Sequence, residues 1–121
     1  LGPNRIPVIN TGWTEKMWRK PGFWEQMPYL EPGVGEFMVG KGVPALAMDI
    51  FPEKAIWRGV KLDPGENWVA NHIALLEKGI PMIQFVTNLS QIGKNRFVLV
   101  ALPLKIRGAD ASPARVIALV E

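Results

Sequence analysis

The chain has 121 residues, of which 48% are hydrophobic and 21% charged, with a formal net charge of +3, and this composition predicts one globular domain and excludes a disordered chain. The absence of cysteine excludes disulfides, thiolate metal ligands and cysteine nucleophiles, and it suits a cytoplasmic location. Lys and Arg are scattered without a run of four, and no apolar run approaches the roughly 18 residues of a membrane span, so neither nucleic acid nor a membrane is an expected partner.

Apolar periodicity and turn residues predict alternating strands and helices, which is typical of an α/β fold with a mixed sheet. Asp49 ends one of the strands, Gly79 is a plausible C-cap, and residues 50–66 are expected to be loop. In chain order the expected elements are strand 6–9, helix 34–38, strand 43–48, a helix from Glu66 or Asn67 to residue 78, and strands 81–86, 97–102, 104–106 and 116–120.

Residues 13–31 form an aromatic-rich excursion that Pro21-Gly22 and Pro28 interrupt, so one continuous helix is excluded. Its aromatic side chains either pack on the protein's own surface or on another subunit, or they line an apolar pocket. In the second case, Trp13, Phe23 and Trp24 are the candidate substrate-binding residues.

His72 is the only histidine, and Gln84 is a polar residue inside an apolar strand. Composition alone favours a hydrogen-bonded core histidine and a satisfied buried amide. The sequence contains no P-loop, no G-x-S-x-G and no H-E-x-x-H, and one histidine cannot hold a metal by itself.

Several segments of the chain form a recognisable series, namely 8-VINTGW-13, Asp49, 72-HIALLEKGIPMIQFVTNL-89, 97-FVLVALPLKIRGADASPAR-115 and 116-VIALV-120. Together they resemble the second half of the metal-dependent cyclase family of hydrolases, which includes kynurenine formamidases and isatin hydrolases. The stretch 101-ALPLKIRGADASPAR-115 is the most specific of these. Asp110 and Ser112 within it are interpreted as parts of a tight turn.

The resemblance implies one domain over residues 1–121, of the swivelling β/β/α type, which is incomplete without a preceding segment or a partner chain. The family's metal motif, H-x-G-T-H-x-D-x-P-x-H, lies in the first half of its members and is absent here. It would come from an N-terminal half or a partner chain, in a homo- or hetero-oligomer.

The resemblance also implies a function, namely hydrolysis of an amide, imide or lactam C–N bond in a small, cyclic or aromatic substrate by metal-activated water. His72 would act as a ligand of a divalent metal, Zn or Mn, or as acid and base. Gln84 stands where two-metal members have a carboxylate, and an amide is a weaker ligand. The alternatives are a non-catalytic structural or regulatory subunit of the same fold and a small-ligand binding module.

Overall fold

The structure is a computed structural model that describes residues 1–120. These residues divide into two compact units, Leu1–Thr87 and a second unit that begins at Asn88. No helix in the described part of the chain is long and apolar enough to cross a membrane.

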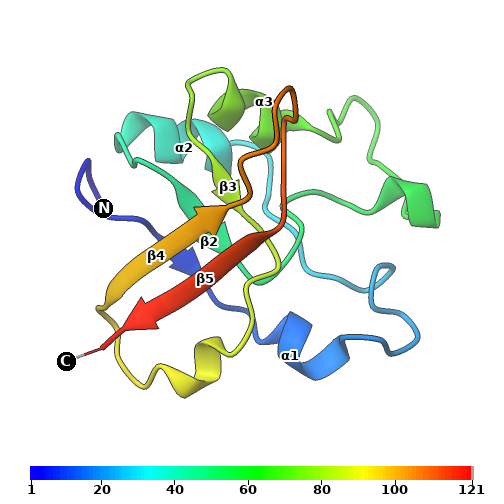
Figure 1. The fold of residues 1–121 in the computed structure, drawn as a ribbon. Coiled ribbons are helices and arrows are strands. Elements are labelled where there is room, and N and C mark those ends of the chain that lie inside the picture. Colours follow the sequence, from blue (N-terminus) through cyan, green and yellow to red (C-terminus); the bar gives the residue numbers. More distant parts are fainter. Residues whose placement is uncertain (121) are drawn as a thin grey trace. The chain divides into compact units, whose positions relative to one another are not determined.

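The first unit is built on a three-stranded parallel sheet in which β2 (Leu46–Met48) lies between β1 (Val8–Ile9) and β3 (Met82–Ile83) (Figure 1). Val8 pairs with Ala47, which in turn pairs with Ile83. Parallel neighbours need crossover connections, and here each crossover contains helices. The carboxyl ends of all three strands therefore meet at one edge.

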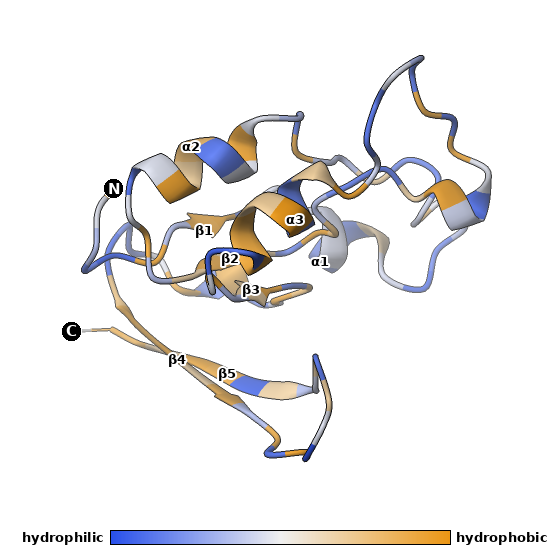
Figure 2. Cartoon of the chain, turned by 90° about the horizontal axis from the view of Figure 1, so that it is seen from above, coloured by the Kyte–Doolittle hydropathy of each residue, from blue (hydrophilic) through white to orange (hydrophobic). Residues whose placement is uncertain are grey.

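Three helices and a 3-10 turn occupy these crossovers: α1 (Trp13–Met17), α2 (Val34–Gly40), η1 (Ile56–Arg58) and α3 (Ala70–Leu76). Helices α2 and α3 lie side by side over one face of the sheet (Figure 2). All three residues of β2 are fully buried, as expected for the central strand of a covered parallel sheet. The core around β2 contains Phe23, Met27, Met38, Val43, Leu46, Met48, Ile50, Leu75 and Ile80.

The two helices approach closely at Gly35, where an added Cβ would lie 2.9 Å from the Cβ of Ala74. Asn71 is 1% exposed and, with Leu75, is one of the two buried residues of α3. Its Oδ1 accepts a hydrogen bond from the Gly35 N–H over 2.8 Å, and its amide donates to the carbonyls of Leu30 and Glu31. A buried asparagine thus fixes α3 against α2 and the chain that leads into it.

The second unit contains a short 3-10 turn, η2 (Leu89–Gln91), and an antiparallel hairpin of β4 (Val98–Pro103) and β5 (Ala114–Leu119). The pairing runs from Val98 opposite Leu119 to Pro103 opposite Ala114. Much of the hairpin is apolar (Figure 2), and seven large apolar side chains of this unit are exposed. These are Val98, Leu102, Leu104, Ile106, Ile117, Leu119 and Val120.

The α/β class is confirmed, with the parallel and antiparallel strands in separate sheets. The strand expected at 104–106 is wrong, because the Leu104 N–H makes a last hydrogen bond to Pro113 and the chain then turns between Ile106 and Ala109. The expected helix begins at Ala70 rather than at residue 66 or 67, because a turn at Asp63–Glu66 and the Asn67 side chain, which accepts from the Val69 N–H, occupy the preceding residues.

Candidate functional site

The candidate site lies at the edge where the parallel strands end. Thr11 follows β1, Asp49 follows β2 and Gln84 follows β3. Ligands of open α/β sheets bind outside the carboxyl ends of the strands, since loops of different crossovers converge there.

Asp49 ties the first two strand ends together. Its carboxylate accepts hydrogen bonds from the Thr11 main-chain N–H over 2.9 Å and from the Thr11 hydroxyl over 3.0 Å. The Thr14 hydroxyl donates to the Asp49 main-chain carbonyl. Asp49 is buried, so its role here is to fix the loop between β1 and α1.

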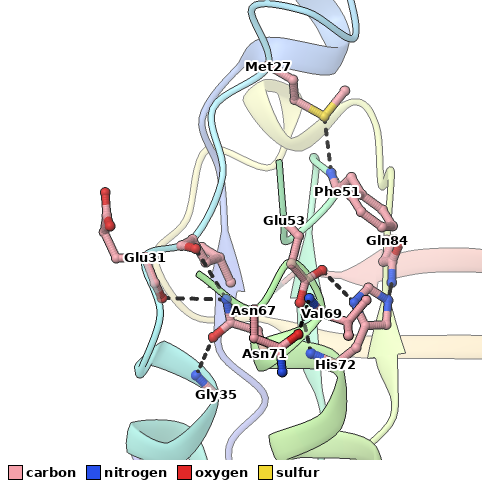
Figure 3. Close-up of polar contacts among 11 residues, drawn as sticks. Met27, Glu31, Gly35, Phe51, Glu53, Asn67, Val69, Asn71, His72 and Gln84 are labelled. Atoms are coloured by element: carbon pink, nitrogen blue, oxygen red, sulfur yellow. Dashed lines mark hydrogen bonds and ion pairs between the residues drawn. The ribbon is translucent and has the colours of Figure 1, made fainter. Parts of the chain in front are cut away.

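Glu53 and His72 form the centre of the site (Figure 3). One carboxylate oxygen of Glu53 accepts from the His72 main-chain N–H over 2.9 Å, and the other lies 2.5 Å from Nδ1 of the ring. The Glu53 side chain is 4% exposed and that of His72 is 23% exposed. A carboxylate in the loop after β2 therefore holds His72 both at its main chain and at its partly accessible imidazole.

Gln84 approaches the other ring nitrogen from the end of β3 (Figure 3). Its amide nitrogen lies 3.1 Å from Nε2 of His72. An amide nitrogen only donates, so Nε2 accepts through its lone pair. The sequence-predicted pair of His72 and Gln84 is thus in direct contact.

The residue after Gln84 has an unusual backbone. Phe85 has φ 54°, in the left-handed region that bulky side chains rarely adopt. Its ring contacts Phe23 and Trp24, with centroids 6.4 and 5.5 Å apart. Such a conformation persists where surrounding packing fixes it, and here that packing comes from the aromatic excursion.

An aromatic cluster extends from this excursion to His72. The Phe51 ring lies 5.2 Å from the imidazole and 4.8 Å from Trp57, which contacts Trp24 and Trp68 in turn. Trp57 is 48% exposed and Trp68 is 38% exposed. An aromatic surface open to solvent therefore adjoins the histidine.

The three aromatic residues singled out in the sequence occupy different positions. Trp24 is half-buried in this cluster, whereas Phe23 is buried in the core. The Trp13 indole N–H donates to the Phe23 carbonyl over 3.0 Å, which fixes the excursion.

The segment after Glu53 is held by ion pairs. Lys54 is buried and contacts Asp63 over 2.8 Å and Glu66 over 2.7 Å, with its ammonium 5.1 Å from the Tyr29 ring centroid. The hydrogen bonds that the Lys54 ammonium donates, first to Asp63 and then to Glu66, raise the pKa of Lys54. The Lys54 ammonium lowers the pKa of both carboxyl groups. These contacts anchor the loop that presents Glu53.

Sequence reasoning missed Glu53, Phe51 and Trp57, because residues 50–66 have no periodicity and their sequence predicts only loop. One signal could have found Glu53. It is a carboxylate in an otherwise apolar stretch, Ile50-Phe51-Pro52, that directly follows a buried strand. A charge in that position requires a partner.

Of the residues at this site, His72 fits the role of a metal ligand, but it is a single ligand. His72 has a nitrogen lone pair, and its other ring nitrogen is bound to a carboxylate, which is how metal-binding histidines are usually held. Within residues 1–120, no group of three or more His, Asp or Glu side chains is placed to hold a metal ion. A shallow hollow of about 350 Å³ between α2 and α3, lined by residues such as Val39 and Ala74, includes none of the site residues.

Comparisons with known proteins point to one kind of hydrolase. The chain is 28% identical over 96 residues to kynurenine formamidase of Bacillus cereus, covering 78% of this chain and 41% of that protein. Its fold matches the solved structure of a potential metal-dependent hydrolase with cyclase activity, with a TM-score of 0.56 and 22% identity, over 74% of this chain and 40% of the other. No protein-family model matches the chain.

The chain thus spans about two fifths of the length of each of these proteins. The resemblance inferred from the sequence is confirmed by a weak homology and by a shared fold. In sequence and in fold, this chain is similar to part of a cyclase-family hydrolase.

Proposed function

We propose that this chain forms part of a metal-dependent hydrolase that cleaves an amide, imide or lactam C–N bond in a small cyclic or aromatic substrate. The observation that carries the proposal is the imidazole of His72, held by Glu53 and partly open to solvent, in a chain homologous to kynurenine formamidase. A divalent cation, Zn or Mn, would polarise the carbonyl and activate water when bound.

His72 is the group of this chain suited to the reaction. Once the Gln84 amide turns away, the Nε2 lone pair of His72 would serve either as a ligand or as a base that accepts a proton from water and returns it to the leaving nitrogen. Gln84 would orient the attacking water or donate a hydrogen bond to the substrate carbonyl. For either role, its amide must turn away from Nε2.

The aromatic cluster beside His72 suits a planar substrate. Trp24, Trp57 and Trp68 are partly exposed, and aromatic faces stack favourably on aromatic rings. In this proposal Trp24 contacts the substrate. Phe23 packs against Trp24, and Trp13 holds Phe23 through a hydrogen bond.

The remaining metal ligands would come from a segment or partner chain that carries the H-x-G-T-H-x-D motif. Two observations support this part of the proposal. One is the coverage of only 41% of the homologous enzyme, and the other is the single imidazole in this sequence. The exposed apolar side chains of the β4–β5 hairpin are a suitable surface for such a segment.

The test uses the complete assembly, as purified from its source, with its subunits identified by intact mass. Zn and Mn content and hydrolysis of an aryl formamide are measured for wild type and for His72→Ala, with Lys78→Ala, at an exposed residue in the turn after α3, as control. Stoichiometric metal and turnover that His72→Ala abolishes and Lys78→Ala retains are expected. A lone 13.5 kDa species without metal or turnover would refute the proposal.

A non-catalytic subunit of the same fold is the second candidate. It is favoured by Gln84, whose neutral amide occupies Nε2 where two-metal members of the family have a carboxylate. That candidate predicts an intact assembly without stoichiometric metal. Turnover that depends on His72 would exclude it.

A further inference from the structure

The contact between Glu53 and His72 has a specific chemical consequence for the ring. A buried, ionised carboxylate only accepts hydrogen bonds, so both groups of His72 that face it must be N–H donors. One is the main-chain N–H and the other is Nδ1. The ring proton therefore lies on Nδ1, and Nε2 carries the lone pair.

The Gln84 contact fits the same tautomer. The amide nitrogen of Gln84 lies 3.1 Å from Nε2, and in this orientation the amide donates to an unprotonated Nε2. The two contacts come from different segments, one from the loop after β2 and one from the end of β3. Both contacts are compatible with a ring proton on Nδ1.

Other contacts keep Glu53 in place. Its neighbour Lys54 is bound to Asp63 and Glu66, and the Phe51 ring lies at 39° to the imidazole with centroids 5.2 Å apart. Glu53 thus approaches His72 from a loop that is anchored on both sides. Its carboxylate has two oxygens for two donors, a match that an amide cannot reproduce with one oxygen.

We propose that Glu53 is a positioning residue that fixes His72 as the Nδ1–H tautomer and directs the Nε2 lone pair toward Gln84 and the substrate side. The effect of Glu53 on catalysis rests on the hydrolase proposal, whereas its effect on the tautomer of His72 is independent of that proposal. Without the carboxylate, one of the two donors of His72 has no acceptor. Gln84 can then turn its carbonyl oxygen to a protonated Nε2, so both tautomers are accommodated.

The single histidine makes the test direct. The full chain is labelled with ¹⁵N in the imidazole ring, so that one pair of ring nitrogens gives signals. Wild type is expected to show a protonated Nδ1 and a pyridine-like Nε2 with well-separated shifts. Glu53→Gln is expected to lose this separation, since the two tautomers exchange, while exposed Glu25→Gln keeps it.

A second variant separates the roles of the two neighbours. In Gln84→Leu the Nδ1–H tautomer is expected to persist, because Glu53 alone determines it. A wild-type spectrum with a protonated Nε2 would overturn the proposal, even if Glu53→Gln fails to fold. Unchanged shifts in folded Glu53→Gln, or a mixed tautomer in Gln84→Leu, would overturn it as well.

The same variants tested in the complete assembly show whether the tautomer matters for function. Glu53→Gln is expected to weaken Zn²⁺ binding roughly 10- to 100-fold, the usual effect of removing a carboxylate behind a metal-binding histidine. An assembly without metal or turnover, but with the Nδ1–H tautomer in wild type and its loss in Glu53→Gln, refutes the hydrolase and leaves the positioning role of Glu53 intact.

Discussion

The amide nitrogen of Gln84 lies 3.1 Å from Nε2 of His72, so a neutral donor occupies the one free lone pair of the only histidine. This contact opposes cation binding at Nε2, because the amide must be displaced first. Replacing the amide by a carboxylate reverses that effect. A carboxylate cannot donate to Nε2, and it adds a charged oxygen ligand next to the imidazole.

Gln84→Glu is therefore expected to bind Zn²⁺ or Mn²⁺ more tightly than wild type in the complete assembly, by a factor of roughly 10 or more, which corresponds to about 1.4 kcal/mol. Isothermal titration calorimetry measures the affinity. Gln26→Glu, an exposed site in the aromatic excursion, adds the same charge away from His72 and should leave the affinity unchanged. Equal effects of the two substitutions would contradict the assignment of Gln84 to the site.

Because α2 and α3 approach closely at Gly35, alanine is expected to have different effects on stability at Gly35 and at Gly40. An alanine Cβ at position 35 would lie 3.0 Å from the Asn71 Cα and 3.1 Å from its carbonyl oxygen. These are backbone atoms, so relieving the clash requires a shift of the main chain. Gly35→Ala should lower the free energy of unfolding by roughly 1–3 kcal/mol. Gly40→Ala, in the same helix with open space around it, should be neutral or stabilising. Urea unfolding compares the two, and equal stability of both variants would refute the close approach.

The carboxylate of Asp49 predicts a stability effect at the edge of the parallel sheet. Asp49→Ala leaves the Thr11 N–H and hydroxyl without their acceptor, which costs roughly 1–3 kcal/mol. Asp110→Ala, in an exposed loop, removes the same charge and should change the stability little. Urea unfolding measures both variants. A wild-type-like midpoint for Asp49→Ala would show that the hydrogen bonds between Asp49 and Thr11 do not contribute to stability.

The ion pairs of Lys54 predict a dependence of stability on acid pH. The ammonium lowers the pKa of Asp63 and Glu66 below their ordinary values of 3.8 and 4.5, so the folded state binds fewer protons there than the unfolded chain. Their contribution is complete above these values and is lost as the pH falls through the lowered ones. The pKa of Lys54 itself is raised, so its contribution persists well into alkaline pH.

Wild type should accordingly be more stable than Lys54→Met at neutral pH, and the difference should shrink as the pH falls below 4.5. Urea unfolding at a series of pH values measures it. Lys41→Met, at an exposed lysine, is the control and should show no such trend. A difference that stays constant down to about pH 2 would contradict the ion-pair assignment.

The sequence predicted most strands because their residues are apolar and bounded by Gly or Pro, and these local signals hold at β1, β2, β3, β4 and β5. The side of α3 that is buried was not predictable in the same way. Ile73 and Leu76 are apolar yet exposed, whereas Asn71 is buried because it satisfies the main chain of α2 and the segment before it. That role depends on a neighbouring helix and not on local hydropathy.

Within the site, resemblance identifies His72 and Gln84, and their contact joins α3 to the end of β3. Glu53 could not be found by any spacing rule, because a loop without periodicity carries it to His72. The same holds for Trp57, which reaches the aromatic cluster from a 3-10 turn. Loops place side chains through tertiary contacts, and a single sequence does not encode those contacts locally.

The order of the strands also bears on how this protein folds. Each parallel pair joins segments that are distant in the chain, and long-range pairing of this kind is slow because loop closure precedes any gain from contacts. Thr11, Glu53, His72 and Gln84 belong to different loops or helices, so no short piece of the chain contains the site. Glu53 and His72 lie in the same crossover, between β2 and β3, so their contact does not depend on the pairing of β1 with β2. Gln84 follows β3, so its contact with His72 requires that crossover to close, and labelled His72 will report this step of folding.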